Sequence, residues 1–450
     1  MFGSEFTVTA TYVLLFLVFG VFVSIVRQSD RRYRFFVPAL GLKILGGLSF
    51  ALIYKYYFGY GDTFGYFEKS LLLTQELQKD FWSGLKTIFY FRDDFGDFIY
   101  REFGVKSRLY SGQDTVVVIK FTALINLLTF SKFFATTIWF SFLSFLGMWY
   151  GYIKLTNVYN SKRLKLVLAV IFFFVPSIFF WGSGLMKDTV IIGFFWPLLL
   201  GLTPLTRLKL PKVSDWPVIL ISAYVVFTAK IFVVYCLIPG LVFMLYHQTK
   251  SQIRNRLLRS VVSPVLLFGL STLSVFGALR LSTFSAKFNL ETAFETAKIY
   301  QDYHLEQSEG GSAYSLSQFD NPVSTYVLNI PFAVNVTFFR PYVWEVNSLV
   351  MSLASLESLL LLMVFLSLLW RGGIRQNLRI IRSDYFLAGM LIFSLLMAYI
   401  VGFATYNFGT LVRYKIPCLM TMLVVFFVLD EKLREARAAR SQLRGRFSLS

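Results

Sequence analysis

Long apolar runs, each ended by a short polar stretch, recur along almost the whole chain. An apolar run of roughly 18 to 22 residues can cross a hydrocarbon core about 30 Å thick as an α-helix. The pattern predicts about eleven membrane-spanning helices, near residues 7–26, 35–54, 133–153, 166–181, 189–203, 214–231, 232–247, 259–277, 348–369, 384–403 and 414–429. The stretch 115–130 is apolar but interrupted by Lys120, and it is either re-entrant or a further span. The predicted fold class is therefore an all-α polytopic integral membrane protein.

Composition and charge agree with this class. Apolar residues make up 56% of the 450 residues and charged residues only 15%, whereas a soluble domain carries about a quarter charged residues. The net charge of +19 is concentrated in short loops and the tail, at 27–34, 162–165, 207–212, 250–259, 371–382 and 432–446. This distribution follows the positive-inside rule. It predicts a multi-pass protein with its N-terminus outside and its C-terminus inside, and it explains the charge without nucleic-acid binding.

The predicted spans divide the chain into six regions. Residues 1–54 hold the first two spans, 55–132 an extracytoplasmic loop with interfacial or re-entrant helices, 133–277 a helix bundle, 278–347 a second extracytoplasmic loop, 348–429 the C-terminal spans and 430–450 a basic cytoplasmic tail. Apolar residues at helical spacing in 69–90 predict an amphipathic helix along the membrane interface. In the second loop we expect a helix from Glu291 to Gln307, followed by a break at residues 310–312.

No motif for a metal or a cofactor is evident. Cys236 and Cys418 lie in apolar segments, and His247 and His304 are isolated, so we expect neither a disulfide framework nor a metal centre. The sequence contains no Walker-type loop. We therefore expect chemistry that depends on no cofactor.

Four polar clusters lie at the ends of apolar segments, and the predicted topology places all four on the extracytoplasmic face. In the first, Gly61-Asp62-Thr63 is followed by Tyr66. Asp62 is a candidate general base for an acceptor hydroxyl, although a helix cap or turn would also explain an Asp beside glycines. The second cluster runs from Trp181 to Asp188 and includes Lys187. A lysine at a helix N-terminus is a candidate phosphate-binding group. An equal alternative is that Lys187 and Asp188 pair with each other in a capped hairpin and bind no ligand.

The third cluster leads into the span near 348–369. Arg340 is a candidate bidentate phosphate ligand, and Tyr342 and Trp344 are candidates for stacking on sugar rings. The alternative is an interfacial aromatic belt in which Arg340 pairs with Glu345.

The fourth cluster, 407–417, contains Arg413, Tyr414 and Lys415 at the outer start of a helix. The helix dipole disfavours cations there, so either a bound anion or snorkelling to lipid headgroups offsets the cost. Glu357 lies within a predicted span, where an unpaired carboxylate costs a few kcal/mol. We expect it to be protonated, paired with Lys230 or Lys120, or exposed to a wet cavity.

Three of these stretches resemble membrane glycosyltransferases of the GT-C type, including the polysaccharide polymerases of O-antigen and exopolysaccharide synthesis. Gly61-Asp62 with Tyr66 is similar to the Gly-X-Asp…Tyr signature of EpsG-type exopolysaccharide polymerases. The run Ser183 to Asp188 is similar to their Gly-Leu-Arg turn, with Lys187 in place of the arginine. The run 413–417 is similar to the Arg-Tyr…Pro run that opens the last helices of many polyprenyl-phosphate-sugar transferases.

The resemblance implies a glycosyltransferase on the extracytoplasmic face of a bacterial plasma membrane. Its partners would be a polyprenyl-phosphate- or pyrophosphate-linked sugar and other proteins of envelope polysaccharide assembly. Asp62 would deprotonate or orient the acceptor, and the phosphate would be held by Arg413, Lys415, Arg340 and Lys187. Polymerisation of repeat units and addition of a single sugar both remain open. A transporter or flippase for lipid-linked or anionic substrates is the alternative, and it would use the charged residues within spans, Lys43, Lys120, Lys230 and Glu357. A structural subunit of an envelope complex is a third possibility.

Overall fold

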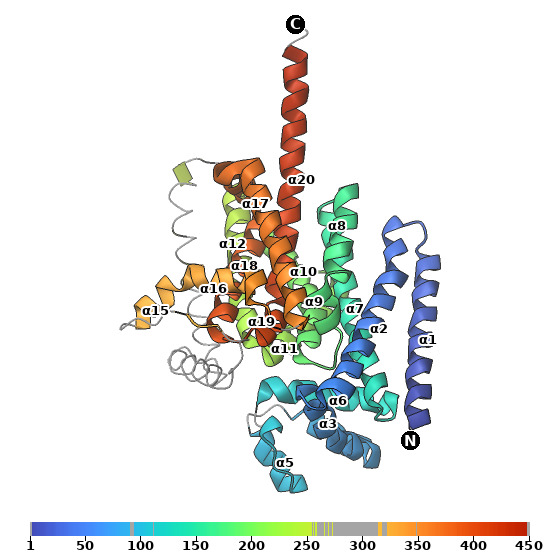
Figure 1. The fold of residues 1–450 in the computed structure, drawn as a ribbon. Helices are drawn as coiled ribbons and strands as arrows, with labels where there is room; N and C mark the ends of the chain where they lie inside the picture. The colour runs from blue at the N-terminus through green and yellow to red at the C-terminus, as the bar shows by residue number, and fades with distance from the viewer. Residues whose placement is uncertain are drawn as a thin grey trace. The chain divides into compact units, whose positions relative to one another are not determined.

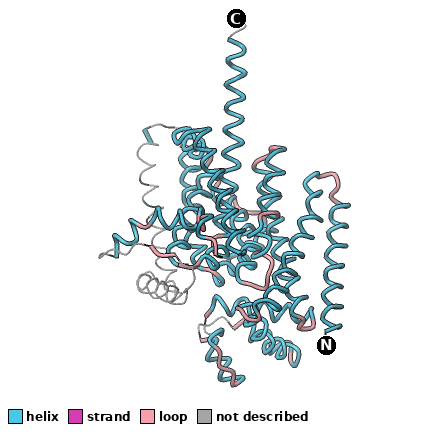
Figure 2. Tube along the Cα trace, in the orientation of Figure 1, coloured by secondary structure: helices cyan, strands magenta, loops and turns pink. Residues whose placement is uncertain are grey.

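The chain is an α-helical membrane protein in the computed structural model (Figure 1). The structure describes residues 2–90, 94–110, 112–253, 255, 257–258, 265, 269, 272, 314–316, 322–347 and 349–447. Within these ranges the regular elements are all helices (Figure 2). Seven described helices are long and apolar enough to cross a membrane: Ser4–Val26, Arg31–Phe58, Phe133–Val158, Lys187–Thr206, Ile231–Gln252, Met351–Ser383 and Tyr385–Ala404. An eighth span exists if Phe408–Tyr414 and Ile416–Ala439, which meet at a 60° bend, cross together.

The predicted number of about eleven spans is therefore not confirmed. The predicted span 166–181 is broken into α8 (Lys162–Phe173) and α9 (Pro176–Trp181). Pro176 causes the break, because the residue before a proline is displaced from helical geometry, and Val175 is extended with φ −73° and ψ 125°. The predicted span 214–231 is a shorter helix, α11 (Trp216–Ala229), of 14 residues. The predicted span 259–277 and the predicted helix Glu291 to Gln307 lie outside the described residues, apart from isolated positions.

The chain forms two compact units. Unit 1 comprises Met1–Leu155, Phe172–Gly201 and Ser214–Lys230, and unit 2 comprises Thr156–Ile171, Leu202–Val213 and Ile231–Ser450.

In unit 1, α2 (Phe36–Ile53) packs against α1 (Phe2–Val26) and α9. The predicted amphipathic helix of 69–90 is divided at Asp80 into α3 (Asp62–Lys79) and α4 (Phe81–Ile88). The stretch 115–130 is α6 (Gln113–Thr129), which packs against α3 and α11. α5 (Phe95–Phe103) lies between α4 and α6 in the sequence.

Small residues allow the backbones of α7 (Phe133–Val158) and α10 (Lys187–Thr206) to approach closely within unit 1. A Cβ atom built on Gly147 would lie 1.6 Å from the carbonyl oxygen of Gly193. Membrane helices commonly pack through such small residues, because lipid provides little hydrophobic driving force between helices. Aromatic rings fill the neighbouring core, where Phe36 meets Phe145 and Trp149 edge-on at 5.0 and 4.7 Å.

In unit 2, α18 (Tyr385–Ala404) is central. It packs against α12 (Ile231–Gln252), α16 (Ile330–Phe339), α17 (Leu349–Ser383) and α20 (Ile416–Phe447). Its glycines lie where neighbours come closest: a Cβ atom on Gly402 would lie 2.2 Å from the carbonyl oxygen of Ala333 on α16.

The predicted basic tail begins as a direct continuation of α20 rather than as a separate segment. Asp430 on this helix is only 4% exposed. Its carboxylate pairs with Arg163 at 2.6 Å, with Arg434 at 3.0 Å and also with Arg371. Three of the basic stretches that define the predicted topology, 162–165, 371–382 and 432–446, therefore meet at one carboxylate.

Candidate functional site

The backbone before Asp62 takes a path that depends on glycine. A π-helical turn, η2 (Tyr54–Phe58), follows α2, and Gly59 then has φ +70°. Gly61 has φ +140°, and a Cβ atom there would lie 2.7 Å from the ring of Tyr54. Glycine is the residue that adopts such angles without steric cost. This path starts α3 at Asp62 and leaves the Asp62 side chain exposed. Among the residues that the structure describes, its carboxylate has no hydrogen-bond or ion-pair partner.

The first and second sequence clusters meet in unit 1. Tyr66 follows Asp62 by one helical turn and is 3% exposed. The Lys187 ammonium lies 5.8 Å from the centre of the Tyr66 ring. It also donates hydrogen bonds to Asp114 Oδ2 at 2.6 Å and to Thr115 Oγ1 at 2.9 Å. We call these five residues the Asp62 cluster. Asp114 and Thr115, in the first turn of α6, were not predicted from the sequence.

Asp188 does not pair with Lys187, as a capped hairpin would require. Its carboxylate instead accepts a hydrogen bond from Lys230, the residue that follows α11. The side chains of Asp188 and Lys230 are 4% and 6% exposed. A substrate would reach Asp188 only if this buried pair opened.

The turn between α9 and α10 is buried within unit 1. All of residues 182–186 are buried. Lys43 on α2 donates to the carbonyl oxygen of Gly182 at 2.5 Å, and Ser141 on α7 donates to that of Ser183 at 2.6 Å. Irregular backbone is tolerated at membrane depth where protein groups satisfy its polar atoms. Lys43 therefore has a structural role at the C-terminal end of α9, where a cation is favoured by the helix dipole.

The third and fourth sequence clusters meet in unit 2. Arg340 Cζ lies 5.3 Å from the ring centre of Phe408, the first residue of α19 (Phe408–Tyr414). The Arg340 guanidinium donates from Nε to both carboxylate oxygens of Glu345 at 3.0 Å, and Nη2 binds the same carboxylate. The Arg340–Glu345 pair, which the sequence left as one alternative, is thus present.

Glu345 is ionised in this arrangement. Burial alone would raise the pKa of Glu345, but hydrogen bonds from Arg340 and from the Tyr342 N–H lower it, and the net effect is a pKa below the usual value. The Tyr342 ring stacks on Trp344 with 4.8 Å between ring centres, and its hydroxyl hydrogen-bonds Asn335. Trp344 is 81% exposed. We call Arg340, Tyr342, Trp344, Glu345 and Asn335 the Arg340 cluster.

Lys415 is held inside unit 2 by protein groups. It is 1% exposed, and its ammonium donates to Ser358 Oγ at 3.3 Å. Ser358 in turn donates to the carbonyl oxygen of Arg340 at 3.1 Å. Glu357 lies near enough to Lys415 for an electrostatic interaction. The cost of placing this cation in the bend before α20 is therefore offset by nearby protein groups.

The remaining predicted residues have other surroundings. Arg413 and Tyr414 are half-buried on α19, and the Tyr414 ring lies 6.5 Å from that of Phe232. Lys120 donates to the carbonyl oxygen of Tyr90 at 2.5 Å. Lys120 and Lys230 thus have partners other than Glu357.

The described residues contain no group of three His, Cys, Asp or Glu side chains arranged to hold a metal ion. Cys236 and Cys418 are buried free thiols. No family model, curated protein or solved structure matches this chain. A functional assignment therefore depends on the residues themselves.

Proposed function

We propose that this protein is a membrane glycosyltransferase that acts on polyprenyl-phosphate- or pyrophosphate-linked sugars at the extracytoplasmic face of a bacterial plasma membrane, in cell-surface polysaccharide assembly. The proposal extends the resemblance of Gly61-Asp62, Ser183 to Asp188 and Arg413 to Pro417. The observation that carries it is the exposed Asp62 carboxylate, which has no partner among the described residues and lies one turn from the Tyr66–Lys187 contact.

The Asp62 cluster contains the groups that such a transfer needs. The acceptor oxygen attacks the anomeric carbon as the bond from that carbon to the lipid phosphate oxygen breaks. Asp62 takes the proton of the acceptor hydroxyl, a role that contributes about 10²- to 10⁴-fold in rate. The departing phosphate keeps the electron pair and gains negative charge, which a nearby ammonium stabilises. Lys187 uses two of its three N–H donors on Asp114 and Thr115, so the third can bind a phosphate oxygen.

The other predicted phosphate ligands fit this role less well. Arg340 and Lys415 belong to unit 2, where Arg340 is bound to Glu345 through Nε and Nη2 and Lys415 is buried against Ser358, whereas Lys187 lies in the same unit as Asp62. Within the proposal, phosphate binding is therefore assigned to Lys187 in unit 1, while Arg340 and Lys415 organise unit 2. Asp114 orients Lys187 and neutralises part of its charge, which favours release of the phosphate product.

A transporter or flippase remains the second candidate, because charged residues are buried in or beside candidate spans. Lys43 is fully buried in the span Arg31–Phe58, and Asp188, in the span Lys187–Thr206, pairs with buried Lys230. Transport would require these groups to exchange partners during the cycle. Their present hydrogen bonds explain them as structural groups, which is why transferase activity is preferred.

The test compares lipid-linked and surface glycans in cells that lack the protein with cells that carry wild type or Asp62→Asn. We expect Asp62→Asn to abolish transfer at normal protein levels. Asp97→Asn is a matched control, because Asp97 is also an exposed acidic residue in the first turn of a helix, α5. Accumulated single repeat units indicate a polymerase, and chains that lack one sugar indicate a single-addition transferase. Activity retained by Asp62→Asn would remove the base assignment, and an unchanged glycan profile in the deletion would reject the glycosyltransferase in favour of transport.

A further inference from the structure

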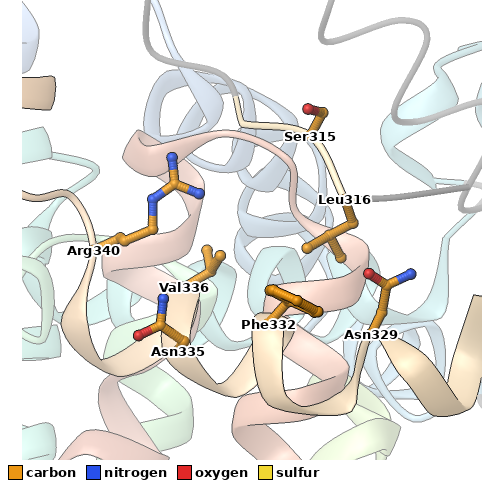
Figure 3. A pocket seen from close by; sticks show the side chains of 7 residues that line it. All are labelled: Ser315, Leu316, Asn329, Phe332, Asn335, Val336 and Arg340. Atoms are coloured by element: carbon orange, nitrogen blue, oxygen red, sulfur yellow. The ribbon is translucent and has the colours of Figure 1, made fainter.

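A polar pocket in unit 2 lies beside the Arg340 cluster. Its volume is about 90 Å³, and it is lined by Ser315, Leu316, Asn329, Phe332, Asn335, Val336 and Arg340. One face of α16 and the residue before it supply Asn329, Phe332, Asn335 and Val336, while Ser315 and Leu316 come from an extended segment opposite (Figure 3). A cavity that holds a single water molecule has a volume of roughly 10–15 Å³ when it is measured in the same way. The pocket therefore has room for a ring-sized group.

The lining offers both donors and acceptors to a ligand. An asparagine side chain has two N–H donors and an oxygen with two lone pairs, and a serine hydroxyl is both donor and acceptor. Asn335 is engaged by one group, the Tyr342 hydroxyl at 2.9 Å, so part of its hydrogen-bonding capacity is unused. Ser315 is exposed, and its side chain has no partner in the described part of the chain. Mixed capacity of this kind suits a ligand whose own groups both donate and accept.

The charge in the pocket argues against a phosphate. Arg340 is the cation of the lining, and its guanidinium is bound through Nε and Nη2 to the ionised Glu345. The pair is close to neutral as a unit. A phosphate site gains its strength from cations that are not already neutralised. Nη1 of Arg340 donates to no described residue, so it can still donate to a neutral oxygen.

Phe332 adds an apolar surface to these polar groups. Its side chain is 58% exposed and lies beside Asn335 and Asn329 in the lining (Figure 3). Ligand sites typically combine apolar and aromatic walls with a few polar groups that fix orientation. A pyranose ring has the matching surface: hydroxyls at its edge and C–H groups on its faces. We infer that this pocket binds one pyranose ring of a neutral saccharide.

This inference rests on the proposed function only for its biological setting, because it requires neither Asp62 nor a transfer step. The test uses the full chain, purified in lipid nanodiscs, and saturation-transfer NMR with methyl pyranosides of glucose, galactose, mannose and N-acetylglucosamine. We expect saturation transfer to at least one of them. Loss of a neutral hydrogen bond or of the aromatic wall, in Asn335→Leu or Phe332→Ala, should weaken binding about fivefold to tenfold.

A control variant and a stability check accompany this test. Ile330→Ala is the matched control, because Ile330 is exposed on α16 but does not line the pocket, and it should bind as wild type does. The glycan assay reports transfer and this assay reports binding in the pocket, so failure of transfer and failure of saccharide binding are distinguishable. Each variant is first checked for a wild-type thermal transition. The inference is overturned if no pyranoside receives saturation, if both pocket variants bind like wild type, or if inorganic phosphate displaces the sugar.

Discussion

The buried Asp188–Lys230 pair leads to a quantitative prediction for unit 1. With side-chain exposures of 4% and 6%, both charges are almost entirely removed from water. Removing one partner of a buried pair costs about 3–5 kcal/mol, because the other charge stays buried without compensation, whereas apolar replacement of both is often neutral. Asp188→Ala and Lys230→Met should each lose about 3–5 kcal/mol of stability. The double variant should lose only about 1 kcal/mol, mainly the favourable interaction of an acidic residue with the N-terminus of α10.

The measurement is a double-mutant cycle on denaturant-induced unfolding in detergent, followed by tryptophan fluorescence. The control cycle uses Glu76 and Lys79 on α3, which pair at 2.7 Å but leave the lysine 72% exposed. An exposed helical pair of this kind contributes at most about 0.5 kcal/mol. If the Asp188–Lys230 coupling energy is no larger than that of the control pair, the burial and pairing described above are wrong. Stable single variants that lose activity would instead favour a transport role for the pair.

Two further predictions concern packing and pH. Gly147→Ala should destabilise the protein by about 1–3 kcal/mol, because its Cβ atom would meet the backbone of Gly193. Gly41→Ala should instead stabilise it by up to about 1 kcal/mol, because a Cβ atom there would have no neighbour within 4 Å outside its own helix backbone. Thermal unfolding of both variants checks this, and equal transition temperatures would contradict it. Because the pKa of Glu345 is lowered on folding, its ionised form stabilises the protein at pH values above the unfolded-state pKa of about 4.5. This contribution is lost as the pH falls through the lower pKa of the folded state. Glu345→Gln should therefore be less stable than wild type near neutral pH, and the difference in urea midpoint should shrink as the pH is lowered below about 4.5; a constant difference would refute the assignment.

The spans were predictable wherever length and hydropathy alone decide the structure. The ranges 7–26 and 133–153 lie within described helices that are long and apolar enough to cross a membrane, and 384–403 matches a third, Tyr385–Ala404, to within one residue. The prediction of one continuous span over 166–181 was wrong, because it was made from apolar content alone and did not weigh Pro176. This proline breaks the helix by its effect on the preceding residue. Hydropathy measures the transfer of side chains into lipid, and it is insensitive to such backbone constraints.

The candidate site was predictable only where its members are close in sequence. Arg340 and Glu345 are five residues apart, and their pairing was one of the two interpretations open from the sequence. The Lys187–Asp114 and Lys230–Asp188 pairs join residues 73 and 42 positions apart. A hydropathy pattern gives each residue a depth in the membrane but no lateral neighbour. The only signal for Asp114 was its place in the first turn of a helix, which is more simply explained by the helix dipole.

The buried turn at residues 182–186 has a consequence for mapping the topology of this protein. Reporter fusions and epitope insertions are usually placed in the turns that join consecutive apolar helices, since such turns are assumed to face water and to tolerate extra residues. Here the turn carbonyls are bound by Lys43 and Ser141, and a Cβ atom on Gly184 would already lie 2.4 Å from Phe50. An inserted tag would displace these contacts and report a misfolded chain. Small single-cysteine probes at the exposed residues Tyr60 and Trp344 are the better markers of sidedness.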